Sequence, residues 1–159
     1  MGYFLNLLIH AIVFLLLAAV FDQLDGTVAR MQGVTKFGAF LDSITDRIGD
    51  FLIFFGIFIG GYISLYLFLA AFISAFLTSY SRSKIESLED LNLYGIGLIE
   101  RSDRLPILLI GSMFQIWFQN TLFWTIIILI IGGFITIIQR VYFAYFYLHN
   151  KRISEEKRA

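Results

Sequence analysis

Long apolar runs alternate with short polar joints along the whole chain. The first run, Tyr3 to Phe21, is nineteen residues long, and the second extends from Phe37 to Gly60. A third run, Tyr62 to Tyr80, follows Gly60-Gly61, a pair typical of a tight turn. About 20 apolar residues in a helix cross the hydrocarbon core of a bilayer, so each run predicts a membrane-spanning helix.

The second half of the chain predicts two further spans. No charged residue occurs over the 35 residues from Leu105 to Gln139, which as one helix would measure about 52 Å. That length exceeds the thickness of a bilayer, so we expect a hairpin at Gln119-Asn120. The fourth span is predicted from about Ile99 to Phe118, and the fifth from Thr121 to about Tyr145.

The composition agrees with an all-α polytopic membrane helix bundle. Apolar residues make up 58% of the chain and aromatic residues 18%, which is too hydrophobic for a soluble domain of 159 residues. We therefore predict one transmembrane domain over residues 1–159, with five spans and a polar cytoplasmic tail at 150–159. The absence of cysteine excludes disulfides and thiolate metal sites. The formal net charge is zero, and we expect no nucleic-acid partner.

The five predicted spans place all twelve Lys and Arg residues on one side of the membrane. The turns at 60–62 and 119–120, on the other side, carry no charge. By the positive-inside rule, the charged side faces the cytoplasm, so we expect a multi-pass protein of the cell membrane. Four aromatic residues flank the uncharged turns as an expected outer belt: Tyr62, Tyr66, Trp117 and Trp124.

Four aspartates occupy the polar joint between the first two spans. Asp22 and Asp25 are three residues apart at the end of the first span, and Asp42 and Asp46 are four apart at the start of the second. Each pair therefore shares one helix face. Crowded carboxylates at a membrane boundary are either neutral or held together by cations. Mg²⁺ or Mn²⁺, which take oxygen ligands and substrate phosphates, would suit them, and this indicates chemistry on a phosphate ester.

The residues around these aspartates form a specific pattern: Asp22-x-x-Asp25-Gly26-x-x-Ala29-Arg30, followed by Gly38-x-x-x-Asp42-x-x-x-Asp46. This pattern resembles the signature of the CDP-alcohol phosphotransferase family, integral membrane enzymes of phospholipid synthesis. An accidental match of eight fixed positions at a given start is expected about once in ten billion.

The resemblance implies a role for each residue of the signature. Metal ions, expected to be two Mg²⁺ or Mn²⁺, would bridge the diphosphate of CDP-diacylglycerol or CDP-archaeol. Asp46 would be the general base as well as a member of the metal site. The first three aspartates would hold the metal, and the remaining positions would contact the CDP-lipid: Gly26, Ala29, Arg30 and Gly38. The two glycines would also let the helices and the nucleotide approach closely.

The family differs from this sequence at its amino-terminal end. Its members typically have six spans and form homodimers, with an interfacial helix and one span before the helix that carries the first two aspartates. Here about twenty residues precede Asp22. We expect either an N-terminally shortened chain or a protein that works with five spans and an external amino terminus.

Asp50 lies one turn deeper than Asp46 on the same helix face. A carboxylate inside a membrane span is costly, so we expect it to have a role. Asp50 could tune Asp46, bind hydroxyl groups of the acceptor or pair with a cation from another span. The sequence leaves these three roles open.

Three arginines outside the signature lie at about the predicted depth of the aspartates. Arg82 ends the third span, Arg104 begins the fourth, and Arg140 lies near the inner end of the fifth. Any one of them alone is typical of a positive-inside anchor. Together they resemble the pattern of phosphatidylinositol phosphate synthases and their archaeal counterparts. That resemblance implies that they bind the phosphate of inositol phosphate.

The sequence therefore favours transfer of a phosphatidyl or archaetidyl group from a CDP-lipid to inositol phosphate, with release of CMP. Another acceptor, such as glycerol phosphate or serine, is the alternative within the family, although an acceptor with its own phosphate explains three cations better than serine does. A divalent-cation transporter is the alternative from another class. It would need polar groups through both halves of the membrane, and the distal half has few.

Overall fold

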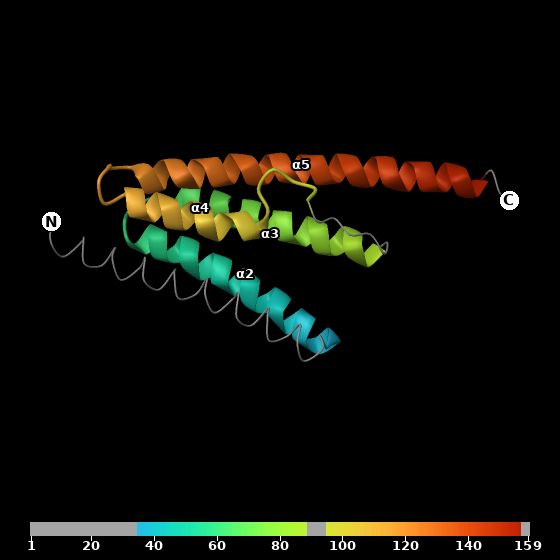
Figure 1. Ribbon diagram of the computed structural model, residues 1–159, viewed down its shortest axis with the longest axis horizontal. Helices are drawn as coiled ribbons and strands as arrows, with labels where there is room; N and C mark the ends of the chain where they lie inside the picture. Colours follow the sequence, from blue (N-terminus) through green and yellow to red (C-terminus); the bar gives the residue numbers. More distant parts are fainter. Residues whose placement is uncertain (1–34, 89–94, 157–159) are drawn as a thin grey trace.

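The computed structural model describes residues 35–88 and 95–156, apart from the side chains of residues 152, 154 and 155. Four helices and no strand occur in these ranges: α2 (Lys36–Ile59), α3 (Leu65–Leu88), α4 (Arg101–Phe114) and α5 (Thr121–Glu156). The helices run lengthwise in one bundle, and α3 packs against each of the other three (Figure 1). The predicted all-α fold is confirmed for this part of the chain. The first predicted span lies outside the described residues.

Helix α2 begins and ends within one residue of the prediction. Thr35 caps its first turn, because the Thr35 hydroxyl accepts a bond of 3.0 Å from the Gly38 amide. Gly60 caps its carboxyl end, and Gly61 has a φ angle of 76°, a conformation that favours glycine. The turn predicted at Gly60-Gly61 is therefore present, and it reverses the chain into α3.

The bounds of the other three helices differ from the predicted ones. Helix α3 begins three residues after Tyr62 and continues beyond Tyr80 to Leu88, where an Arg82–Glu86 pair one turn apart supports its polar end. Helix α4 is shorter than predicted and ends at Phe114. Helix α5 continues to Glu156, so most of the predicted polar tail is helical.

The turns between α2 and α3 and between α4 and α5 lie at the same end of the bundle (Figure 1). In the second turn Asn120 has a φ angle of 69°, which agrees with the predicted hairpin. The side-chain oxygen of Gln115 accepts a bond of 2.9 Å from the Leu122 amide and ties the two helices together. Both turns are thus separated from the charged residues by the apolar length of the helices.

The core lies along the contact between α3 and α5, where glycines allow close approach. A Cβ atom at Gly133 would overlap the Ser74 hydroxyl, and one at Gly132 would overlap Ile99. The Ser74 hydroxyl donates to the Ile130 carbonyl at 3.3 Å, and Thr78 is 1% exposed in the same contact. The main buried apolar side chains are Phe54, Ile63, Phe68, Ala71, Ala75, Ile99, Leu108, Ile126 and Leu129.

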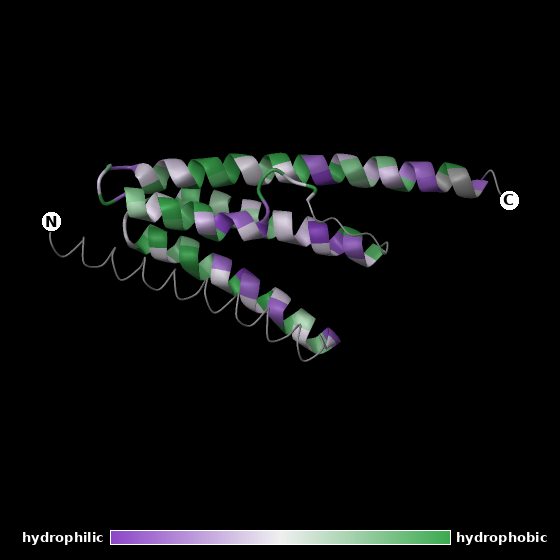
Figure 2. Cartoon of the chain, in the orientation of Figure 1, coloured by the Kyte–Doolittle hydropathy of each residue, from purple (hydrophilic) through white to green (hydrophobic). Residues whose placement is uncertain are grey.

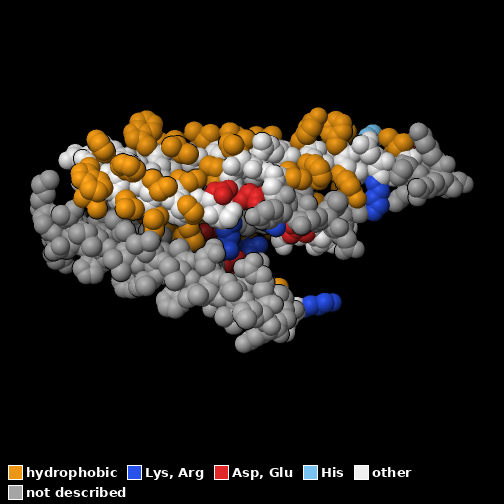
Figure 3. All heavy atoms as spheres, in the orientation of Figure 1, with side chains coloured by type: hydrophobic (Ala, Val, Ile, Leu, Met, Phe, Trp, Pro, Cys, Tyr) orange, Lys and Arg blue, Asp and Glu red, His pale blue; other side chains and the backbone are white. Residues whose placement is uncertain are grey.

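Two helices, Leu65–Leu88 and Thr121–Lys151, are long and apolar enough to cross a membrane. Large apolar side chains remain exposed on the bundle, among them Tyr66 at 83% and Trp117 at 70%. Hydrophobic residues dominate towards the turn end, whereas hydrophilic residues gather on α2 and α3 farther from it (Figure 2). In the space-filling view, apolar side chains cover the upper face and charged side chains gather below (Figure 3). This distribution is typical of a membrane protein.

Candidate active site

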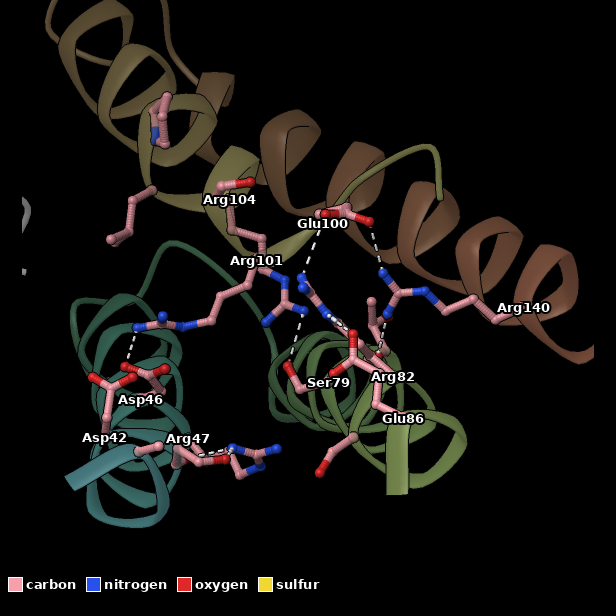
Figure 4. A pocket seen from close by; sticks show the side chains of 17 residues that line it. Asp42, Asp46, Arg47, Ser79, Arg82, Glu86, Glu100, Arg101, Arg104 and Arg140 are labelled. Carbon is pink, nitrogen blue, oxygen red and sulfur yellow. Dashed lines mark hydrogen bonds and ion pairs between the residues drawn. The ribbon is translucent and has the colours of Figure 1, made fainter. Parts of the chain in front are cut away.

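A cavity of about 700 Å³ lies among the four helices, at the level where the charged side chains gather. Figure 4 shows that the labelled side chains point into it from α2, α3, α5 and the start of α4. Most of the residues that line the cavity are polar or charged: Asp42, Ser43, Asp46, Arg47, Thr78, Ser79, Arg82, Ser83, Glu86, Glu100, Arg101, Ser102, Arg104 and Arg140, with Ala39, Leu105 and Pro106.

Helix α2 contributes the carboxylate side of the cavity. Asp42 and Asp46 lie one turn apart on the same face, as predicted. Asp46 accepts a hydrogen bond from Arg101 of α4, whose side chain reaches across the cavity (Figure 4). Among the described residues no group of three metal-ligating side chains occurs. Five predicted site residues lie outside the described residues: Asp22, Asp25, Gly26, Ala29 and Arg30.

Gly38 lies in the first turn of α2. A Cβ atom there would lie 3.0 Å from the Thr35 hydroxyl that caps the helix. The absence of a side chain at this position therefore keeps the cap undisturbed. Its expected contact with the nucleotide stays a prediction.

Asp50 pairs with a cation from another helix, which was one of the three roles considered. Its carboxylate accepts a hydrogen bond from Arg104 of α4. The Asp50 side chain is 13% exposed and that of Arg104 is 5% exposed, so this ion pair is largely shielded from water. The pair connects α2 to α4.

Arg104 is also fixed by α3. Its second terminal nitrogen donates to the Ala75 carbonyl at 3.1 Å and to the Ser79 hydroxyl at 3.4 Å. Contacts with α2 and α3 hold this guanidinium group of α4 in one place at the edge of the cavity.

Arg140 is the most deeply buried of the three predicted arginines, with 1% of its surface exposed. Its Nε donates to the Ile96 carbonyl at 2.8 Å, and a terminal nitrogen donates to the Thr78 carbonyl at 2.6 Å. The other terminal nitrogen donates to the Glu100 carboxylate at 2.9 Å. A buried guanidinium with this many partners is not a snorkelling membrane anchor, because it does not reach the lipid surface.

Arg82 is more open than the other two, with 34% of its side chain exposed. It pairs with Glu86 at 3.0 Å on the same helix, and its terminal nitrogen lies 3.7 Å from a Glu100 oxygen. The structure thus brings Arg82, Arg104 and Arg140 to one cavity together with Asp42 and Asp46.

Two residues that sequence reasoning did not select also take part in the site. Arg101 contacts Asp46, and Glu100 lies between Arg82 and Arg140. Both belong to the segment Glu100-Arg101-x-x-Arg104, in which only Arg104 was predicted as a site residue. A carboxylate adjacent to two arginines at the start of a buried helix was the available signal for them.

Comparison with known proteins agrees with the sequence pattern. Residues 3–87 match the model of the CDP-alcohol phosphatidyltransferase family. Archaetidylinositol phosphate synthase from Pyrococcus horikoshii is 38% identical over 141 residues, which cover 88% of this chain and 72% of the relative.

Solved structures give the same result. The structure of phosphatidylinositol phosphate synthase from Mycobacterium tuberculosis with CDP-DAG bound is similar, with a TM-score of 0.70 and 30% identity over 80% of this chain and 68% of that one. The same enzyme in complex with manganese and citrate gives a TM-score of 0.69 and 30% identity over 80% and 65% of the two chains. The chain therefore belongs to the CDP-alcohol phosphatidyltransferase family and is a transferase of phospholipid biosynthesis.

Proposed function

We propose that this enzyme transfers a phosphatidyl or archaetidyl group from a CDP-lipid to inositol phosphate and releases CMP. The observation that carries the proposal is the cavity itself, which has aspartates on one side and three arginines from three other segments around it. The names of the relatives support the same acceptor, since both are inositol phosphate synthases. CDP-DAG is bound in one of the related structures, which supports the donor.

The donor set of the site fits a divalent cation. Asp42 and Asp46 supply hard oxygen ligands on one face of α2 at the cavity. We propose that they hold Mg²⁺ or Mn²⁺, expected to be two ions, together with Asp22 and Asp25. Bound there, the ions would neutralise the negative charge of the diphosphate. Manganese in a related structure supports a divalent metal.

The residues of the chain can then be assigned to the steps of the transfer. Arg82, Arg104 and Arg140 would bind the phosphate of the acceptor through charge-assisted hydrogen bonds. A hydroxyl oxygen of the acceptor would attack the β-phosphorus of the CDP-lipid while Asp46 takes its proton. The new bond joins that oxygen to the β-phosphorus, and the bond from the β-phosphorus to the oxygen shared with CMP breaks. The cytidine and diphosphate would lie against Gly26, Ala29, Arg30 and Gly38.

Asp46 would have to exchange partners in this scheme. It is paired with Arg101 in the structure, and as a base it must face the acceptor hydroxyl. The Arg101 side chain is 36% exposed and extends across the cavity, so it can turn towards an anionic substrate. The charge of the Asp46 carboxylate, which is 14% exposed, would then be balanced by the bound cations.

Two acceptors remain as alternatives, and one function is set aside. Glycerol phosphate would use the same three arginines, whereas serine carries no phosphate for them. Membership of a transferase family sets aside the cation transporter.

The first test is an acceptor panel on the detergent-purified full chain with radiolabelled CDP-lipid. We expect turnover with inositol phosphate and much slower turnover with free inositol, glycerol phosphate and serine. Arg140→Gln, the matched variant, should reduce the use of inositol phosphate about ten- to a hundredfold, because a buried charge-assisted contact is lost. Faster turnover of serine than of inositol phosphate would refute the proposed acceptor.

We further propose a multi-pass topology of five spans with the cavity facing the cytoplasm. The two turns lie at one end of the bundle (Figure 1), and the described ends of the helices there carry none of the arginines that line the cavity, which supports this orientation. Single cysteines at Gly61 and Ser87, both exposed, should label from opposite sides of intact cells with an impermeant reagent. Labelling of both from one side would contradict the topology.

The family resemblance also leads us to propose a homodimer. Light scattering of the purified protein should give twice the chain mass of 18.3 kDa after subtraction of detergent. A mass of one chain would contradict it.

A further inference from the structure

Glu100 occupies a fixed position at the entrance of α4. It is the residue before the helix, and its amide donates to the Asp103 carboxylate at 2.8 Å. Such a bond at a helix amino terminus holds the preceding residue in place. Glu100 as a whole is 8% exposed, so its carboxylate is directed into the protein and not into solvent.

The Glu100 carboxylate bridges two arginines from different helices. One oxygen accepts a bond of 2.9 Å from Arg140 of α5, and the other lies 3.7 Å from Arg82 of α3. Figure 4 shows Glu100 above both guanidinium groups, at the rim of the cavity that all three residues line. No part of the proposed reaction uses this carboxylate directly.

The contacts of Arg140 show what the bridge does. The guanidinium group uses three of its five N–H groups for Ile96, Thr78 and Glu100. Two N–H groups remain for an anion in the cavity. Of the three partners, Glu100 is the one that carries a negative charge, and Arg140 is too deeply buried for water to replace it easily.

We propose that Glu100 is a positioning residue for the acceptor: it holds the guanidinium groups of Arg140 and Arg82 in the orientation that binds the acceptor phosphate. This inference rests on the proposed function of the arginines. A carboxylate at this position also repels an anionic ligand, so its removal has two opposing effects. Loss of orientation dominates, because Arg140 is 1% exposed and its neutral partners are backbone carbonyls that do not balance its charge.

The test is steady-state kinetics of Glu100→Gln on the purified full chain. We expect the KM for inositol phosphate to rise about tenfold, the size of one charge-assisted contact, while the KM for CDP-lipid changes little. In an Arg140→Gln background, Glu100→Gln should raise the acceptor KM much less, because Glu100 acts on the acceptor mainly through Arg140. An unchanged or lower acceptor KM, or full additivity with Arg140→Gln, would overturn the proposal.

Asp103→Asn is the matched control for a purely structural role. Asp103 bonds the Glu100 amide at the same helix end, and none of its hydrogen bonds involves the arginines of the cavity. The asparagine side-chain oxygen can still accept from the Glu100 amide, so Glu100 keeps its position and the acceptor KM should be unchanged. The loss of a negative charge at the helix amino terminus should lower the thermal stability. If Glu100→Gln only lowered stability in the same way, Glu100 would be a structural residue and the proposal would fail.

A binding measurement separates this inference from the choice of acceptor. If the parent enzyme does not use inositol phosphate, the proposed function fails, and inorganic phosphate then serves as the probe in titration calorimetry. Weaker phosphate binding by Glu100→Gln than by the parent would support the positioning role. Equal binding, or no binding by the parent, would overturn it.

Discussion

The two sides of the cavity differ in how they are held. On the carboxylate side, Asp42 is exposed on α2, a helix that packs against α3 and meets α4 through two ion pairs. On the arginine side, Arg104 and Arg140 are 4% and 1% exposed and bond to backbone carbonyls of α3. The arginine side is therefore preorganised by the core of the fold, which reduces the cost of ordering it when an anion binds.

The same contrast appears within α2, between two aspartates one turn apart. Asp46 pairs with Arg101, whose side chain is 36% exposed, whereas Asp50 pairs with Arg104, whose side chain is 5% exposed. The two aspartates are similarly buried, at 14% and 13% exposed, so the pairs differ in their arginines. The pair with the exposed Arg101 should open at a lower cost than the pair with the buried Arg104. Asp46 is thus suited to a catalytic role, whereas Asp50 is suited to holding α2 against α4.

Substitution of Asp46 should have the largest effect on turnover. Asp46→Asn removes the proposed base, so we expect kcat to fall by about 10²- to 10⁴-fold, the usual contribution of a general base. CDP-lipid binding should be retained, because the other aspartates keep most of the metal site. Turnover and binding would be measured on the same detergent-purified sample.

Asp25→Ala is the comparison for this variant, since it should lose metal-dependent binding of the CDP-lipid. If Asp46→Asn turned over about as fast as the parent, Asp46 would not be the base. The proposed contrast between the carboxylate side and the arginine side of the cavity would then fail as well.

Substitution of Asp50 should have a smaller effect on turnover and a larger one on stability. Asp50→Asn leaves the buried Arg104 without its carboxylate, and loss of one partner of a buried pair typically costs about 3–5 kcal/mol. We expect a clearly lower unfolding temperature in detergent, with kcat of the folded enzyme reduced far less than in Asp46→Asn.

The double variant Asp50→Asn with Arg104→Gln sharpens the test. It removes both charges, so it should be more stable than Asp50→Asn alone. If Asp50→Asn alone unfolded at the same temperature as the parent, the Asp50–Arg104 pair would not hold α2 in place.

The sequence predicted the apolar lengths of the helices better than their ends. Helix α2 agreed within one residue because Thr35 and Gly60 mark its bounds with local signals. The carboxyl end of α3 was predicted from the end of the apolar run. The prediction was too short, because Ser81 to Leu88 is polar but still helical. The carboxyl end of α5 was misjudged for the same reason.

The site was predictable where a residue type is unusual in its surroundings. A carboxylate or guanidinium group within an apolar run, as with Asp50 or Arg140, indicates a partner or a function. The partners themselves were not predictable, because Glu100 and Arg140 are 40 positions apart and meet only through the packing of α4 on α5. Glu100 lies in a polar joint, and its position next to arginines in the sequence does not indicate which of the distant arginines it contacts.

The glycine pair at 132–133 limits how this protein can change. Each glycine faces a different neighbour, Ile99 or Ser74, and neither contact has room for one more carbon atom. Thr136, one turn further along α5, hydrogen-bonds Ile99, and Arg140 follows after another turn. A methyl group at either glycine would therefore separate α5 from its neighbours close to the acceptor site. Among natural or random variants, these two positions should tolerate as little as the aspartates do, although they take no part in the chemistry.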